Sequence, residues 1–207
     1  MNNNNIVIFL LISYFVTSQQ QIDIPVELFK EISGSKIEEE YIGSIFVFDN
    51  YRAGQIILNE NKIPLKLNIN AYSNVFTYID DFGKKYELKP NLDLKILIDN
   101  KKYSYLSIDG KDIITTQISR INDDLLFKSF YTKITLPRNS SNGYDLPKPG
   151  KIEIKNNFIF FIEGKYYLVT KNKKSVINAF PNHKELIKKS KLRFKDEDDF
   201  YKFFNLL

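Results

Sequence analysis

A strict alternation of apolar and polar residues constrains this chain more than any other feature. It runs through Lys62–Tyr72, and a period of two is typical of a β-strand with one face toward a core and one toward water. The sequence therefore predicts a half-buried strand. Its apolar face carries Ile63, Leu65, Leu67, Ile69 and Ala71, and its water face carries Lys62, Pro64, Lys66, Asn68 and Asn70.

Similar short runs follow one another from Gly43 to Leu136, and again from Lys151 to Thr170. Short polar connections favour antiparallel neighbours, and no helical apolar period long enough for a crossover interrupts them. Asp109-Gly110 is the clearest hairpin signal, because both residues tolerate the positive φ of a tight turn. The expected strands are Ile45–Phe48, Gln55–Leu58, Lys62–Tyr72, Val75–Ile79, Lys84–Leu88, Leu92–Ile98, Lys101–Ile108, Ile113–Arg120, Leu125–Leu136, Lys151–Ile154, Phe158–Ile162 and Lys165–Thr170.

From Lys171 the period changes to that of helices. Asn172 is expected to cap a helix over Lys173–Phe180, and Asp196 a helix over Glu197–Leu206. Asn182 with Glu185 predicts a capping box for Lys184–Lys191 between them. The apolar residues expected against the sheet are Val176, Ile177, Phe180, Leu186, Ile187, Phe200, Phe203 and Phe204.

The N-terminal residues predict export. Ile6–Val16 is an apolar run of eleven residues, shorter than the roughly 20 that cross a bilayer and of the length found in secretory signal peptides. Val16-Thr17-Ser18 offers small residues for cleavage after Ser18. Met1–Asn5 lacks the usual Lys or Arg, so a buried N-terminal strand or helix is the alternative. The chain has no cysteine, which excludes disulfides and thiolate chemistry.

These patterns divide the chain into four parts. We expect a signal peptide over residues 1–18, an extended lead-in over 19–42, an antiparallel β domain over 43–170 and a helical tail over 171–207 packed on that domain. About ten strands are too many for one flat open sheet. The predicted fold class is therefore mainly β (α+β), an antiparallel meander curled into a barrel-like or folded-over sheet with a short helical C-terminal tail.

No residue is predicted to be catalytic, cofactor-binding or metal-binding. His183 is the one histidine, and nothing in the sequence marks a partner for it as a general base. The acidic clusters Asp80-Asp81, Asp123-Asp124 and Asp196–Asp199 lie in expected turns or at a helix start, which accounts for them structurally. No phosphate-binding glycine loop or Gly-x-Ser-x-Gly motif is present. Tyr103, Tyr105, Tyr166 and Tyr167 suit a binding surface or, more simply, sheet packing.

Positive charge gathers toward the C-terminus. Residues 147–207 hold 14 Lys or Arg and 7 Asp or Glu, whereas residues 1–146 hold 16 and 18. The lysines of the tail would suit an anionic envelope surface, and the simpler alternative is a solvated helical face. No cofactor and no nucleic-acid partner is expected.

The segment Gly43–Leu58, GSIFVFDNYRAGQIIL, and the strand Leu65-Lys66-Leu67-Asn68 resemble small exported proteins of unknown function from Bacteroidota. The resemblance extends to a β-rich middle and a Lys-rich helical tail. It implies export and a β-rich fold, and it brings no catalytic residues with it.

The function expected is an exported, non-enzymatic binding or structural module of the cell envelope, periplasmic or extracellular. The alternative is a barrel or half-barrel that carries an apolar ligand such as lipid, which requires an empty cavity. We expect a filled core, with Phe200, Phe203 and Phe204 covering the sheet face that contains Leu65, Leu67, Ile69, Leu94, Ile96 and Ile98.

Overall fold

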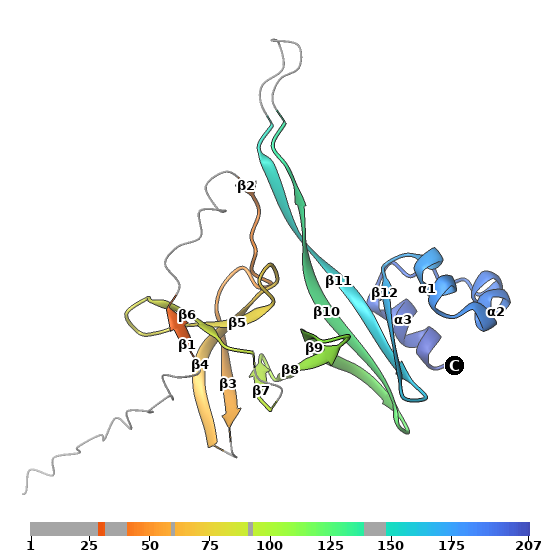
Figure 1. Cartoon of the computed structure of the whole chain (residues 1–207), viewed down its shortest axis with the longest axis horizontal. Helices are drawn as coiled ribbons and strands as arrows, with labels where there is room; N and C mark the ends of the chain where they lie inside the picture. Colours follow the sequence, from red (N-terminus) through yellow and green to blue (C-terminus); the bar gives the residue numbers. More distant parts are fainter. Residues whose placement is uncertain (1–28, 32–40, 59–60, 91–92, 139–147) are drawn as a thin grey trace, which may run out of the picture.

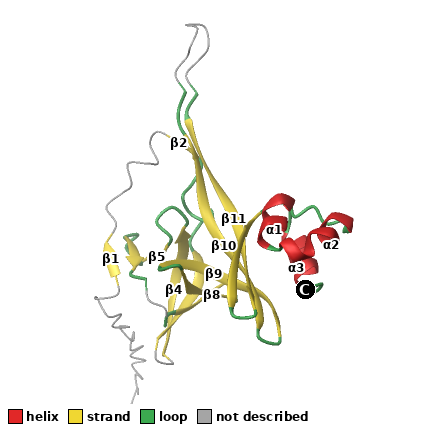
Figure 2. Cartoon of the chain, turned by 45° about the vertical axis from the view of Figure 1, so that its right-hand side comes forward, coloured by secondary structure: helices red, strands yellow, loops and turns green. Residues whose placement is uncertain are grey.

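The computed structural model of the chain describes residues 29–31, 41–58, 61–90, 93–138 and 148–207. The predicted signal peptide and most of the predicted lead-in lie outside these residues. Twelve strands form one sheet, and three short α-helices follow them (Figures 1 and 2). The strands are β1 (Phe29–Glu31), β2 (Tyr41–Ile42), β3 (Arg52–Leu58), β4 (Asn61–Asn70), β5 (Val75–Ile79), β6 (Lys85–Leu88), β7 (Lys95–Ile98), β8 (Lys101–Ile108), β9 (Lys111–Ile121), β10 (Asp124–Thr135), β11 (Gly150–Ile162) and β12 (Lys165–Thr170).

The predicted fold class is confirmed: the chain is mainly β and mostly antiparallel, with a helical end. The strand order is β1-β6-β5-β4-β3-β7-β8-β9-β10-β11-β12, and β2 pairs with β11, the one parallel pairing among the described strands. The sheet is not closed into a barrel. Type I′-like turns join β7 to β8, β8 to β9 and β11 to β12, as at Asp109 and Gly110, whose φ values are +51° and +74°.

The first half of the sheet folds over itself. Three strands separate β5 from β8 in the sheet, yet the Phe76 and Tyr105 rings lie 5.3 Å apart, edge to face. The Asn74 side chain, in the β4–β5 turn, bonds the backbone of β9, accepting from the Ile114 N–H at 3.1 Å and donating to the Asp112 carbonyl. These contacts enclose a core made of buried side chains from β3 to β9.

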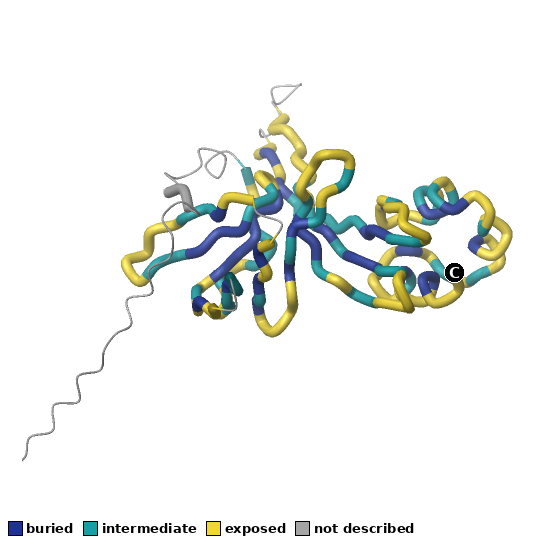
Figure 3. Tube along the Cα trace, turned by 60° about the horizontal axis from the view of Figure 1, so that its bottom comes forward, coloured by how far each residue is buried: buried dark blue, intermediate teal, exposed yellow. Residues whose placement is uncertain are grey.

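A second core lies under the helices. It joins β10, β11 and β12 to α1 (Lys173–Ala179), α2 (Lys184–Lys189) and α3 (Glu197–Phe204). The Phe158 and Phe200 rings stack 3.8 Å apart, and Phe203 and Phe204 pack near Phe160. Figure 3 shows buried residues both along the folded-over strands and beside the helices, and their side chains form two separate clusters. The expectation that the tail covers the face containing Leu67 was therefore wrong, because Leu67 lies in the first core.

Several local predictions also differ from the structure. Residues 45–48 are an irregular segment with one bridge, Phe46 to Asn70, instead of a strand. That segment covers the polar face of β4, so Asn68 and Asn70 are buried although the alternation placed them in water. Asn68 compensates by accepting from the Phe48 N–H at 3.1 Å and donating to the Phe48 carbonyl at 2.8 Å. A buried amide with satisfied hydrogen bonds is stable there.

Further predictions concern the C-terminal third. The expected strands Lys151–Ile154 and Phe158–Ile162 are one continuous strand, β11, because the whole length of β10 pairs with it. Asn172 and Asp196 cap α1 and α3 as predicted, accepting from the Ser175 and Asp199 N–H groups. The predicted capping box at Asn182 is wrong: Pro181–His183 is a 3₁₀ turn, and α2 starts without a side-chain cap. Leu186, expected against the sheet, is exposed.

Candidate functional site

A groove lies where β5 ends beside a longer neighbour. β5 pairs with β4 only from Lys66 to Asn70, and it stops at Ile79. β4 continues to Asn61, so its outer edge over residues 61–65 has no strand partner among the described residues. Pro64 lies in this segment, which fits the rule that a proline within a strand marks an edge. The end of β5 beside the longer β4 leaves a hollow on the surface.

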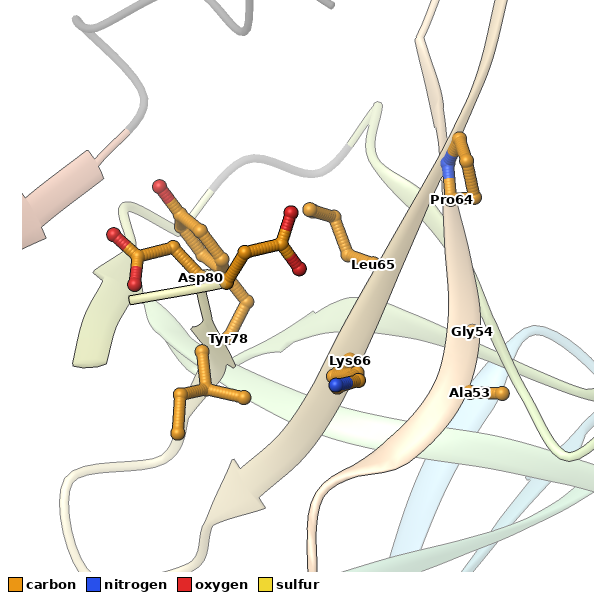
Figure 4. Close-up of a pocket in the computed structure, with 9 residues that line it drawn as sticks. Ala53, Gly54, Pro64, Leu65, Lys66, Tyr78 and Asp80 are labelled. Atoms are coloured by element: carbon orange, nitrogen blue, oxygen red, sulfur yellow. The ribbon is translucent and has the colours of Figure 1, made fainter. Parts of the chain in front are cut away.

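The groove has a volume of about 430 Å³, in the range of roughly 300–1,000 Å³ that ligand sites occupy. Its floor is mostly apolar, and its ends are charged. In Figure 4, Leu65 extends from β4 toward the side occupied by Tyr78 and Asp80, and Lys66 lies on the near side of β4. The lining consists of Ala53 and Gly54 from β3, Pro64, Leu65 and Lys66 from β4, and Tyr78, Ile79, Asp80 and Asp81 from β5 and its turn.

Gly54 contributes to the shape of this groove through its missing side chain. A Cβ at this position would lie 2.4 Å from the Leu97 carbonyl oxygen and 2.8 Å from Leu67 Cδ1. Neighbouring atoms therefore pack directly against the backbone of β3, and any larger residue would force the strands apart. The same glycine lines a second hollow on the β7 side, beside Leu97 and Asp99.

The turn after β5 forms a rigid rim. Asp80 Oδ1 accepts from the Phe82 N–H at 2.9 Å and from the Lys84 N–H at 2.8 Å, and two backbone bonds close the same turn. Tyr86 donates its hydroxyl to Asp80 Oδ2 at 3.2 Å. This fixed turn presents the Phe82 side chain, which is 93% exposed. Phe82 follows directly on Asp81, a residue of the groove lining, so its exposed ring lies next in the chain to the groove.

Stacked tyrosines support the floor of the groove. The Tyr78 and Tyr86 rings lie 4.8 Å apart and nearly parallel. Burial raises the pKa of Tyr78, and the neighbouring Tyr86 and Asp80 raise it further, so its hydroxyl stays protonated and can donate a hydrogen bond. The groove therefore combines an apolar floor with a hydroxyl donor and carboxylate acceptors. Such a set suits non-covalent recognition.

The residues weighed in the sequence lie apart from one another. His183 is half-buried, and its ring meets Phe180 edge-on at 6.4 Å. Of the acidic clusters, Asp80-Asp81 lines the groove. Asp124 accepts from the Glu163 N–H, and Asp199 accepts from the Arg193 and Phe194 N–H groups. Each of these carboxylates thus fixes a turn or a helix start.

The four tyrosines do not form one surface. Tyr103 and Tyr105 lie in the first core, where burial raises the pKa of both hydroxyls. Tyr167 packs on Phe180 in the second core, and Tyr166 is exposed beside Phe161.

The lysine-rich tail has its apolar side against the sheet. Ile187 is buried and Leu192 packs on the second core. Two of its lysines pair locally, Lys188 with Glu185 and Lys202 with Asp198. This arrangement is that of a solvated helical face.

In the part of the chain that the structure describes, no helix has the length and apolar character to span a bilayer, and no three His, Asp or Glu side chains gather as metal ligands. Comparisons with protein-family models, curated proteins and solved structures found nothing that matches this chain.

The sequence analysis did not predict the groove. Pro64 inside an alternating strand was the available signal, because a proline within a strand marks an unpaired edge.

Proposed function

We propose that this chain is an exported, non-enzymatic binding module of the cell envelope, and that the groove at the end of β5 holds an extended segment of a partner protein. The observation that carries the proposal is the preformed groove itself, with the unpaired edge of β4 on one side and the Phe82 turn on the other.

The edge and the groove suit one mode of recognition. An extended segment can add to a free strand edge through its backbone while its side chains enter adjacent pockets. Here the free edge is residues 61–65, and the adjacent pocket is formed by Leu65, Tyr78 and Ile79. An apolar partner side chain would fill this pocket, and Asp80 and Asp81 favour a basic residue beside it. Phe82 would then be covered by the partner.

The energetics are consistent with specific binding. Burying the Phe82 side chain against a partner is worth roughly 1.5–3 kcal/mol before binding costs. The turn that holds Phe82 is already fixed by the Asp80 bonds, so little additional order is required on association.

The packing of the first core favours a binding module with a filled core and speaks against a lipid carrier, which would need an empty cavity. Leu67, Leu94, Ile96 and Ile98 have no exposed surface, and they pack together with Phe76. A carrier would need a cavity bordered by such residues. Export is part of the same proposal, and its support is the apolar run Ile6–Val16 with the small residues that follow it.

The test is a matched pair of substitutions at exposed apolar residues. Phe82→Ser removes the proposed anchor, and Leu168→Ser, at a residue 51% exposed on β12, is the control. Purified, tagged protein is incubated with envelope extract from the source organism. We expect Phe82→Ser to abolish capture of a partner that the wild type and Leu168→Ser both retain, with all three melting within about 2 °C. Equal capture by Phe82→Ser would contradict the proposal.

A further inference from the structure

A second groove lies at the opposite end of the sheet, where β12 stops beside β11. β12 ends at Thr170, opposite Asn157, whereas β11 continues back to Gly150. β2 covers β11 only at Gly150 and Lys151, so the outer edge of β11 over residues 152–156 has no strand partner among the described residues. The groove at this step has a volume of about 570 Å³ and shares no residue with the groove beside Phe82.

The chemistry of this groove is cationic and polar. It is lined by Tyr131 and Lys133 from β10, Ile154, Lys155 and Asn156 from β11, and Thr170, Lys171 and Asn172 from the chain after β12. The sheet register places Tyr131 directly opposite Lys155, and Lys133 opposite Glu153. Side chains directly opposite in adjacent strands point to the same face. The tyrosine ring and two ammonium groups therefore share the face that the helices leave uncovered.

Local hydrogen bonds fix the wall of the groove. Asn172 Nδ2 donates to Thr170 Oγ1 at 3.0 Å, and the Thr170 N–H donates to Ser175 Oγ at 3.0 Å.

The charges of the groove are only partly compensated. Glu153 accepts from Lys151 at 3.1 Å and lies 3.4 Å from Lys155 Nζ, and both lysines lower its pKa, Lys151 most. Lys133 and Lys171 form no ion pair within the described part of the chain. Together with the exposed N–H groups of a sheet edge, these ammonium groups favour an anion.

We propose that this groove binds an acidic oligosaccharide. The lysines recognise its carboxylate or sulfate groups, and the Tyr131 ring, 37% exposed, packs against the apolar face of a sugar while Thr170, on the same face, bonds one of its hydroxyls. The proposal does not rest on the function assigned to the groove beside Phe82, because the two sites have separate residues and separate tests.

The experiment measures binding of the full mature chain to polygalacturonate and dextran sulfate by calorimetry, with neutral dextran and inorganic phosphate as comparisons. Lys133→Gln, Lys155→Gln and Lys171→Gln are combined in one variant. Its control combines Lys89→Gln, Lys95→Gln and Lys111→Gln, which remove the same charge from exposed positions outside both grooves. Circular dichroism and melting confirm that both variants are folded.

We expect one of the acidic polymers to bind the wild type and the control equally, and the groove variant to bind about 10- to 100-fold more weakly. Tyr131→Leu should also weaken this binding while leaving its salt dependence unchanged, since it removes no charge. Equal losses in both lysine variants, or no saturable binding to either polymer, would overturn the proposal. Inorganic phosphate binding that Tyr131→Leu does not alter would overturn it in favour of a simple anion site.

Discussion

Leu67→Ala is the substitution that examines the first core most closely. Leu67 has no exposed surface and lies between Arg52 of β3 and Tyr78 of β5 in the sheet register. The change removes three buried carbon atoms, worth about 2.4 kcal/mol at ~0.8 kcal/mol each. The cavity left behind adds to this, and Leu→Ala changes in cores cost about 2–5 kcal/mol. We expect a loss near 3 kcal/mol, because Phe76 and the strands on both sides restrict collapse of the site.

The assay is urea unfolding followed by circular dichroism, with the free energy of unfolding taken from the midpoint and slope. A loss of about 3 kcal/mol corresponds to a fall in Tm of roughly 6–12 °C for a chain of this size. Leu168→Ala, at a half-exposed position on β12, is the control and should cost under about 1 kcal/mol. A loss below about 1 kcal/mol for Leu67→Ala, together with lipid extracted from the purified wild type, would refute the filled core and favour a carrier.

Three further predictions follow from the structure and the sequence. Gly110→Val should cost about 1–3 kcal/mol in the same unfolding assay, because φ at Gly110 is +74°, and an unchanged midpoint would show that the turn is loose. Asn68→Ala should lower the free energy of unfolding by about 1–3 kcal/mol, because it leaves the Phe48 N–H and carbonyl without their partner. Equal urea midpoints for the wild type and this variant would contradict the prediction. Intact mass spectrometry of protein from the source organism should give a chain that starts at Gln19, and a mature protein that retains Met1 would speak against export.

The strands were largely predictable because their signal is local. Alternation within Val75–Ile79 and Lys101–Ile108 identified β5 and β8 to the residue, and Asp-Gly chemistry identified the turn at Asp109. Capping residues likewise identified the starts of α1 and α3. Each of these features depends on neighbours within a few positions, so the sequence contains the information directly.

The predictions from the sequence were wrong where residues far apart in the chain determine burial or strand pairing. Asn68 has a polar side chain on the expected water face, but the irregular segment before β3 covers that face and supplies its hydrogen bonds. The sequence predicted separate strands over Lys151–Ile154 and Phe158–Ile162, yet the long partner strand β10 keeps β11 continuous between them. Periodicity cannot reveal such a cover or such a partner.

The two cores and the two grooves depend on the relative lengths of neighbouring strands. The first groove exists because β5 ends at Ile79, opposite Lys66, while β4 extends beyond that pair to Asn61. Pro64 indicated an edge, but only the register shows which neighbour is missing there. The separate aromatic core under α3 could not be assigned from the sequence, since Phe200 has no pattern that distinguishes one sheet face from another.

Site-specific photo-cross-linking from position 82 tests the binding-module account most directly. A photoreactive phenylalanine analogue replaces Phe82 in the full chain, and the same analogue at position 168 is the control. After irradiation in cells of the source organism, the account predicts one cross-linked partner protein at position 82, with the linked partner peptide containing an apolar residue near a lysine or arginine, and no such product at position 168. Identical products at both positions, or none at position 82, would contradict it.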